Sequence, residues 1–236
     1  MNQMPVQNVI CRIKSREIFT DRIFALRVKA KDGCIFDHAP GQYAIISLPS
    51  DDSHDPRPYS IASMPDTNEL VFHIKDVGRG LSHALMNAPE GTEVALEYPL
   101  GSAVYRPKKS PIIAIGGGLG LAPILPIIRT ALKDDPSHDV FLYHGAAKES
   151  DLYLDEKLKS MCKTYPHLEY KGVIEDIDGT VGAIAAAAHD DLSNFNAYLS
   201  GAPAMVIACF KALEEKGLDI KNTISDALSG EIKDFV

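Results

Sequence analysis

The sequence has few cysteines, and they lie far apart. Cys11, Cys34, Cys162 and Cys209 contain no pair at the two- to four-residue spacing of zinc or iron–sulfur sites, so no metal cluster is expected. The eight histidines show no metal-ligand spacing either. An even number of cysteines leaves two disulfides open, but nothing else is typical of a secreted protein, and free thiols in a reducing compartment are favoured.

Long apolar runs and an N-terminal targeting segment are also lacking. No apolar stretch approaches the ~18 residues that cross a bilayer. The first ten residues, MNQMPVQNVI, have no basic segment followed by an apolar core. Together with the expected free thiols, these absences predict a cytoplasmic protein without membrane insertion.

Basic residues are outnumbered and scattered. The sequence has 24 Lys and Arg against 32 Asp and Glu, for a formal net charge of -8, which argues against a surface for nucleic acid or anionic membranes. We therefore expect small molecules or proteins as partners. Apolar residues at 45% and charged residues at 24% are ordinary for a globular chain, and 236 residues suffice for two domains.

The first half has the pattern of an antiparallel β domain. Apolar and polar residues alternate with period two, between Gly, Pro and Asp punctuation, over residues 23–30, 42–48, 69–77 and 93–100. A helix is predicted over 80–88, where apolar residues recur at helical spacing. Residues 1–103 are thus expected to form a small barrel or sandwich.

In the second half, strands alternate with helices. Strands are predicted over 111–116, 139–145, 168–174, 196–201 and 222–228, and helices over 121–133, 152–165, 181–190 and 203–217. This order indicates βαβ units, in which a parallel sheet is covered on both faces. The basic, proline-containing segment 104–111 is the expected linker, and 112–236 the α/β domain. Ligands of such sheets bind beyond the carboxyl ends of the strands, where the strand order switches.

Two glycine-containing turns follow strands of the predicted sheet. The loop GGGLGLAP, Gly116–Pro123, lacks the Cβ atoms that would keep backbone amides away from a ligand, and the following helix start adds partial positive charge. A pyrophosphate suits this loop, although its spacing departs from the usual dinucleotide fingerprint and a tight turn without ligand stays the alternative. The segment YLSGAPAM repeats the design after the fourth strand, with Ser200 at the crevice and Pro203 in the first helical turn. The two turns together favour a dinucleotide site.

The segment DPRPYS lies in the β half. Its two prolines hold the chain extended, so Arg57 and Tyr59 project to the same side. A guanidinium and a phenol on one face suit a ligand that has a phosphate and a flat aromatic system. The alternative is that Arg57 pairs with Asp55 while Tyr59 fills the edge of the core. Downstream, Gly80–Ser82 opens the short helix and offers a further anion-binding helix start.

The order of these motifs resembles that of the ferredoxin-NADP reductase superfamily, whose members are flavin- and nicotinamide-dependent reductases, over nearly the whole chain. The resemblance implies an antiparallel Greek-key flavin-binding β-barrel followed by a five-stranded parallel α/β domain for the nicotinamide dinucleotide. The segment RPYS is similar to the family's Arg-x-Tyr-Ser motif. It implies Arg57 on the flavin phosphate, Tyr59 stacked on the isoalloxazine and Ser60 near its N5, with Pro58 in the same site.

Four further segments carry the resemblance. GRGLS is similar to the Gly-x-x-Ser segment that holds the FAD pyrophosphate, which implies Gly80, Leu81 and Ser82. YPLG resembles a Gly-Pro-x-Gly that ends the barrel, with Tyr98 replacing the first glycine. GGGLGLAP and LSGAPAM are similar to the family's Gly-Gly-Thr-Gly-Ile-Ala-Pro and Cys-Gly-Pro-Pro-x-Met. The implied dinucleotide contacts are Gly117, Gly118, Gly120, Pro123, Gly201, Ala202 and Met205.

The departures from the family pattern concern the reaction site. Gly118 replaces a usual threonine, and Ser200 replaces a cysteine that many members have close to the nicotinamide C4. Ser60 and Ser200 are the expected catalytic residues, since they would position the two rings for hydride transfer. Many relatives end in an acidic residue and an aromatic that covers the flavin. Here Asp226 is followed by alanine and leucine, so no lid is assigned, although Phe235 in the tail 229–236 is a candidate.

The resemblance implies a reductase that takes hydride from NADH or NADPH onto FAD and passes electrons to a separate acceptor, a ferredoxin-like protein or an oxygenase component. Ala147 stands where relatives that use NADPH often have arginine, and only Lys148 is near, which favours NADH. The chain lacks a cysteine-rich ferredoxin module, so any iron–sulfur partner is expected to be a separate protein.

Two alternatives stay open. The first is an NAD(P)H:flavin reductase that binds FMN or riboflavin as a substrate and releases it reduced; the Gly80–Ser82 segment favours bound FAD instead. The second is a non-catalytic subunit that keeps the fold and senses nicotinamide or transfers electrons within a larger complex. Sequence divergence after loss of catalysis would account for the departures from the family pattern at Gly118 and Ser200.

Overall fold

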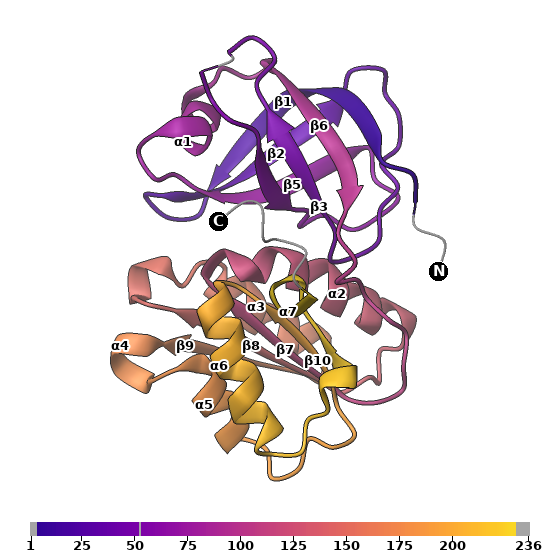
Figure 1. The fold of residues 1–236 in the computed structure, drawn as a ribbon, viewed down its shortest axis with the longest axis vertical. Coiled ribbons are helices and arrows are strands. Elements are labelled where there is room, and N and C mark those ends of the chain that lie inside the picture. Colours follow the sequence, from indigo (N-terminus) through magenta and orange to yellow (C-terminus); the bar gives the residue numbers. More distant parts are fainter. Residues whose placement is uncertain (1–3, 52, 230–236) are drawn as a thin grey trace.

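The computed structural model describes residues 4–51 and 53–229, and it has two parts stacked along the long axis of the molecule (Figure 1). The predicted tail residue Phe235 lies outside the described residues. The first part is a six-stranded antiparallel sheet in the order β4-β3-β6-β1-β2-β5. Its elements are β1 (Gln7–Ile18), β2 (Ile23–Ala30), β3 (Tyr43–Ser47), β4 (Arg57–Ser60), β5 (Glu69–Lys75), α1 (Gly80–Asn87) and β6 (Glu93–Leu100).

The two edge strands of this sheet approach each other. An isolated antiparallel bridge joins Ile61, just after β4, to Phe72 of β5. The sheet therefore curls into a nearly closed barrel, as the sequence predicted. Strand β4 is the predicted extended segment RPYS, and it pairs with β3 so that Tyr59 lies opposite Ala44.

Strand β1 was not among the predicted strands. Over its 12 residues only Cys11 and Ile13 are buried, and a register shift between Ile13 and Ser15 interrupts its pairing with β2. The burial alternates over residues 8–15, but the exposed residue Ile10 is apolar and stands between Val9 and Cys11, so the sequence itself shows no apolar–polar alternation there.

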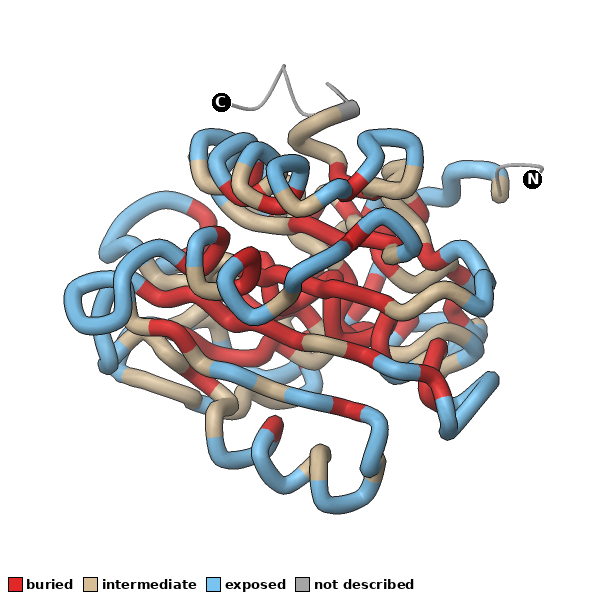
Figure 2. Tube along the Cα trace, turned by 90° about the horizontal axis from the view of Figure 1, so that it is seen from below, coloured by how far each residue is buried: buried red, intermediate tan, exposed pale blue. Residues whose placement is uncertain are grey.

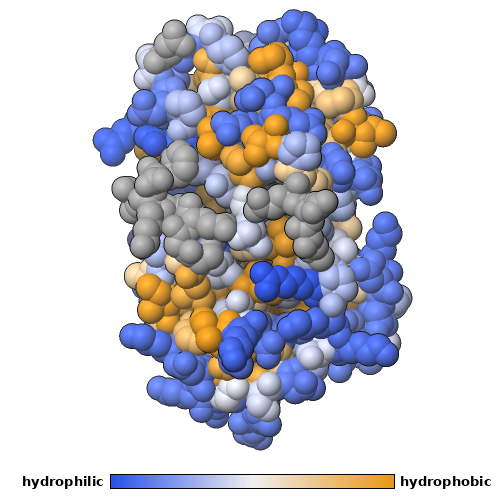
Figure 3. All heavy atoms as spheres, turned by 45° about the vertical axis from the view of Figure 1, so that its right-hand side comes forward, coloured by the Kyte–Doolittle hydropathy of each residue, from blue (hydrophilic) through white to orange (hydrophobic). Residues whose placement is uncertain are grey.

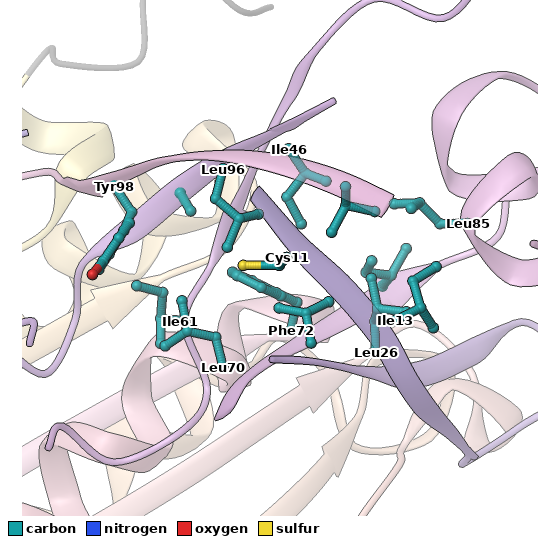
Figure 4. Packing of buried hydrophobic residues seen from close by; sticks show 14 of the residues in the cluster. Cys11, Ile13, Leu26, Ile46, Ile61, Leu70, Phe72, Leu85, Leu96 and Tyr98 are labelled. Carbon is teal, nitrogen blue, oxygen red and sulfur yellow. The ribbon is translucent and has the colours of Figure 1, made fainter. Parts of the chain in front are cut away.

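The barrel core surrounds Cys11. Figure 4 shows its sulfur between Phe72 and Leu96, which come from two other strands and are at most 1% exposed. Burial raises the pKa of Cys11 to about 12, so this thiol stays protonated near neutral pH. All four cysteines lie within the described ranges and are free, as the sequence favoured.

The second part is a five-stranded parallel sheet in the order β11-β10-β7-β8-β9. Its elements are β7 (Ile112–Gly117), η1 (Gly118–Gly120), α2 (Leu121–Asp134), β8 (Val140–Ala146), η2 (Glu149–Asp151), α3 (Asp155–Thr164), β9 (Leu168–Ile174), α4 (Glu175–Asp178), α5 (Val181–Ala187), β10 (Asn196–Ser200), α6 (Pro203–Glu214), η3 (Ile220–Asn222), β11 (Thr223–Ile224) and α7 (Asp226–Ser229). The strand order reverses between β7 and β10, which places the topological switch at the two predicted turns.

Helices cover both faces of this sheet. Residues of α2 and α3 pack in one apolar cluster with alternate residues of β7 and β8, on the side turned toward the barrel, and α5 and α6 pack on the other face (Figure 1). Figure 2 shows the buried strands running through the interior with exposed loops around them. No described helix is long and apolar enough to cross a bilayer.

Some predicted boundaries were wrong. Helix α3 begins at Asp155 rather than 152, because Leu154 has a φ of 61°, outside helical geometry. The predicted closing strand 222–228 is a strand only at Thr223–Ile224, and α7 begins at Asp226. Only Thr223 and Ile224 pair with β10, and the carboxylate of Asp226 accepts a hydrogen bond from the Ala103 N–H at 3.3 Å.

Apolar and polar contacts join the two parts. Ile23 of β2 packs within the apolar cluster of α2 and α3. Lys75 of β5 donates to Asp151 at 3.0 Å, and Lys157 of α3 bonds to Glu17 of β1. Figure 3 shows one face of the molecule, on which hydrophilic residues surround separate apolar groups. The barrel is therefore held against the layer of α2 and α3, with β4 and β5 near the carboxyl ends of the parallel strands.

Candidate active site

The two glycine-containing turns touch each other at the ends of β7 and β10, where Ser200 pairs with Gly116. A Cβ on Gly120 would overlap the carbonyl oxygen of Ser200 and lie 2.7 Å from the backbone nitrogen of Gly201. A Cβ on Gly117 would overlap the sulfur of Met205. These two glycines therefore permit close packing of the turns.

Gly118 differs from its neighbours. Its φ is 53°, in the left-handed region, and no described atom beyond its two chain neighbours lies within 4 Å of the place a Cβ would take. This glycine borders open space just before the start of α2, where backbone amides and the helix dipole favour an anion.

A cavity of about 660 Å³ lies beside these turns, at the ends of β7, β8 and β9. Four of the predicted dinucleotide residues line it, namely Gly117, Gly118, Ala202 and Met205. The other walls are mainly small and apolar, including Ala146 and Ala147. A concave, apolar space with an anion-favouring turn at its edge fits a dinucleotide.

The charged groups of this cavity are mostly acidic. Lys75, Asp151 and Glu175 line it, and Lys75 is paired with Asp151 at 3.0 Å. Glu175, the first residue after β9, is exposed. The sequence predicted the coenzyme preference from Ala147 and Lys148 alone. Glu175, at the end of the next strand, is a further candidate determinant of that preference.

A second cavity, of about 410 Å³, lies between the barrel and the two turns. Pro58, Tyr59 and Ser60 of β4 line it from one side, and Ser200 and Gly201 from the other. The predicted catalytic serines thus come together from different domains. Because the second cavity shares Gly117, Leu119 and Ala202 with the dinucleotide cavity, the two spaces adjoin.

Tyr59 offers a partly buried aromatic surface in the second cavity. The residue packs against the barrel core, as the alternative interpretation of this segment expected, and it also lines the cavity. Burial raises the pKa of Tyr59 to about 12, so its phenol is neutral near pH 7. A flat ring system fits against such a surface.

Arg57 lies at the start of β4 and is not among the described residues that line the cavity. Its guanidinium is 3.6 Å from a carboxylate oxygen of Asp55, as the alternative interpretation proposed. The two side chains are 52% and 84% exposed, so this ion pair contributes little and exchanges readily. Binding of a flavin phosphate by Arg57 stays a prediction.

Helix α1 begins at Gly80, as predicted. The Ser82 hydroxyl accepts a hydrogen bond from the Val77 N–H at 3.3 Å and lies 3.4 Å from the Arg79 carbonyl, to which it donates. Ser82 therefore shapes the turn that precedes the helix. At Gly80, whose φ is 63°, no described atom beyond its chain neighbours lies within 4 Å of a Cβ position, so the backbone of Gly80 borders open space. Leu81 is buried, at 4% exposed, and its contact with a pyrophosphate stays a prediction.

Among the residues of the second cavity that were not predicted as site residues, two are ionisable, His73 and Asp226. Burial lowers the pKa of His73 to about 3, so its ring is neutral. Alternation along β5 could have signalled it, because His73 stands between the barrel-core residues Phe72 and Ile74 and so faces outward. The predicted Pro123 instead lines a small neighbouring cavity that also contains Ser200.

Known families match the two parts separately. Residues 11–105 match the oxidoreductase FAD-binding domain, and residues 114–211 match the oxidoreductase NAD-binding domain. Among solved structures, the cytochrome P450 reductase of Amycolatopsis is similar with a TM-score of 0.86 at 24% identity, over 94% of this chain and 70% of that one. At this identity the likeness shows the fold.

Several curated proteins are similar over most of the chain. The ferredoxin–NAD(P)(+) reductase component of the naphthalene 1,2-dioxygenase system of Pseudomonas putida is 36% identical, over 81% of this chain and 61% of that protein. The propane 2-monooxygenase reductase component of Mycolicibacterium smegmatis is 30% identical, over 98% and 70%. The probable flavin reductase of Photobacterium leiognathi is 30% identical, over 93% and 97%. The chain spans about three fifths of the length of the dioxygenase relatives. It belongs to the ferredoxin-NADP reductase superfamily, with an FAD-binding barrel followed by an NAD-binding α/β domain.

Proposed function

We propose that this protein is a reductase that takes hydride from NADH onto bound FAD and passes electrons to a separate acceptor, a ferredoxin-like protein or an oxygenase component. The observation that carries this proposal is the cavity in which Tyr59 and Ser60 of the barrel face Ser200 and Gly201 of the α/β domain. This second cavity adjoins the larger dinucleotide cavity at the glycine turns. A flavin in the second cavity and a dinucleotide in the larger one would therefore meet between the domains.

The chain's own residues bind and orient in this scheme. FAD, when bound, supplies the redox chemistry. The Tyr59 ring supports the flat face of the flavin, while the hydroxyls of Ser60 and Ser200 fix the two rings from opposite sides. The backbone of Gly118 and the start of α2 receive the dinucleotide pyrophosphate. No side chain acts as a nucleophile.

The coenzyme is proposed to be NADH. A ribose 2′-hydroxyl can donate to a carboxylate such as Glu175, whereas the 2′-phosphate of NADPH would add negative charge beside Glu175 and Asp151. The cation in the same cavity, Lys75, is already paired with Asp151. Ala147 offers no charge to a phosphate.

The acceptor and the compartment are also part of the proposal. The reductase components of dioxygenase and monooxygenase systems among the relatives support an acceptor protein. The four free cysteines support a reducing compartment, the cytoplasm.

A flavin reductase that releases its flavin is the second candidate, favoured by the similarity to the flavin reductase of Photobacterium leiognathi over 97% of that protein. Purification distinguishes the two. A protein that retains FAD through gel filtration supports the reductase with bound flavin. A colourless protein that reduces added riboflavin at catalytic rates would establish the second candidate instead. Protein that neither binds flavin nor oxidises NADH would point to a non-catalytic subunit.

A further inference from the structure

Three buried polar side chains that the proposed reaction does not use lie together between the domains. His73 lies in β5, and Tyr153 lies just before α3. The Nδ1 of His73 is 3.1 Å from the hydroxyl oxygen of Tyr153. The Tyr153 ring meets the His144 ring of β8 edge-on, with centroids 5.2 Å apart and planes at 88°. His144 and Tyr153 are at most 2% exposed and His73 is 7% exposed.

His144 bonds directly to the dinucleotide loop. Its Nε2 is 3.2 Å from the carbonyl oxygen of Gly118. Because a carbonyl only accepts, Nε2 carries the hydrogen. Burial lowers the pKa of His144 to about 4, so the ring is neutral near pH 7 and its Nδ1 is unprotonated. That Nδ1 is buried and has no hydrogen-bond partner among the described residues. Burying an unsatisfied polar atom lowers the stability of the fold. An apolar residue at this position would not have that cost.

Gly118 is a residue whose backbone conformation such a bond can restrain. A glycine has the widest range of backbone conformations, and Gly118 takes a left-handed one, with φ at 53°, beside the open cavity. Apart from its chain neighbours, no described residue has an atom within 4 Å of the position of a Cβ on Gly118, so no side-chain packing fixes this backbone. The hydrogen bond from His144 therefore restrains the loop from the opposite, buried side of the sheet.

We propose that His144 is a positioning residue for the dinucleotide: by donating from Nε2 to the Gly118 carbonyl, it holds the loop in the conformation that receives the pyrophosphate. Tyr153 in turn holds the His144 ring. Tyr153 is fixed to the barrel by the bond to His73 and by Phe19, whose ring stacks on it with centroids 5.4 Å apart. This inference rests on the proposed function, since it assumes that the loop binds a nicotinamide dinucleotide.

The test measures NAD+ affinity by calorimetry on the flavin-loaded protein, where no turnover interferes. His144→Leu, which removes the donor, is expected to weaken NAD+ binding about 3- to 10-fold, the range of one lost hydrogen bond. His144→Gln, whose amide nitrogen can reach the carbonyl, is expected to restore affinity to within about twofold. Flavin content should be unchanged in both variants.

His138 provides the matched control. It is also a buried histidine whose Nε2 bonds to a backbone carbonyl, that of Ser110 at 2.9 Å, but it is not among the described residues that line either cavity. His138→Leu should leave NAD+ affinity unchanged. If His144→Leu fails to fold, His144→Asn, whose amide is one carbon too short, replaces it. Hydrogen exchange over residues 116–121 should be faster in the His144→Leu or His144→Asn protein and normal in the glutamine variant.

A double-mutant cycle tests the role of Tyr153. Because Tyr153 acts through the His144 ring, Tyr153→Leu should weaken NAD+ binding in the wild-type protein and have little further effect on His144→Leu. Additive effects would overturn the link through Tyr153. Unchanged NAD+ affinity in His144→Leu, or an equal loss in His138→Leu, would overturn the role of His144 while leaving the proposed function intact. A wild-type protein that binds no NAD+ would instead refute both.

Discussion

Ser60 of β4 and Ser200 at the end of β10 line the same cavity, although they belong to different domains. The two serines lie in one cavity because the barrel packs on the layer of α2 and α3. Ile23 of the barrel is part of the apolar cluster of the second domain. The proposed reaction needs two rings held in close contact, and this pair of hydroxyls borders the space in which they would meet.

The hydroxyl of Ser200 is expected to orient the nicotinamide without contributing to its affinity. Ser200→Ala should slow reduction of the flavin by NADH about tenfold, as expected for one lost orienting hydrogen bond, with little change in NAD+ affinity. Stopped-flow absorbance and calorimetry measure the two quantities. A larger effect on affinity than on rate would assign Ser200 to binding instead.

Arg57 should contribute to flavin affinity through a charge-assisted contact. Arg57→Ala is expected to weaken FAD binding by about 1.5 to 3 kcal/mol. Asp55→Ala is the control: it removes only the exposed partner at 3.6 Å and should leave affinity equal or slightly higher. Fluorescence titration of the flavin-free protein with FAD measures both. Equal affinity in wild type and Arg57→Ala would refute a phosphate contact.

Glu175 should set the preference for NADH. The wild-type kcat/KM is expected to favour NADH over NADPH by at least about tenfold, and Glu175→Gln should reduce that ratio about 3- to 10-fold by removing a carboxylate from the cavity. Asp176→Asn removes an exposed neighbouring charge that is not among the cavity residues described, and it should leave the ratio near the wild-type value. A wild-type preference for NADPH would contradict this assignment.

Buried histidines should make the fold less stable in mild acid. Burial lowers the pKa of His73 to about 3 and of His144 to about 4, whereas an unfolded histidine titrates near 6.5. Between these values the unfolded chain binds more protons than the folded one, so the free energy of unfolding falls as the pH is lowered from about 6.5 to about 4. The slope is expected to be up to about 1.4 kcal/mol per pH unit for each such histidine.

Neighbouring carboxylates titrate below most of this range. A hydrogen bond from Lys157 lowers the pKa of Glu17, and although burial alone would raise the pKa of Asp155, its bonds to Lys159 and Tyr170 lower it. Urea denaturation at several pH values above 4.5 therefore reports mainly on histidines. His144→Gln should reduce the slope by the share of one histidine; an unchanged slope would show that His144 is not a source of the pH dependence.

The sequence predicts the fold well where a residue pattern reflects burial. Strands β7, β8 and β10 and the two glycine turns were recognised because these strands are largely buried apolar runs, each with a glycine close to its carboxyl end. Strand β1 was missed because the exposed Ile10 is apolar, so Val9, Ile10 and Cys11 form an apolar run in place of an alternation. The strand expected over 222–228 was too long, because only Thr223 and Ile224 pair with β10 and a helical turn begins at Asp226.

The candidate site is predicted only in part. The motifs predicted Tyr59, Ser60 and Ser200, which line one cavity, because their neighbours in the sequence have a recognisable order. They could not find His73 or His144, because an isolated histidine has no spacing signal and its importance comes from contacts with Tyr153 and Gly118. These contacts depend on how the two domains pack.

Anaerobic stopped-flow mixing of the FAD-loaded protein with NADH tests the central claim most directly. The account predicts rapid loss of the oxidised flavin absorbance in a single turnover, with NADPH reacting more slowly. An absorbance that stays unchanged with either coenzyme would contradict the proposed reductase.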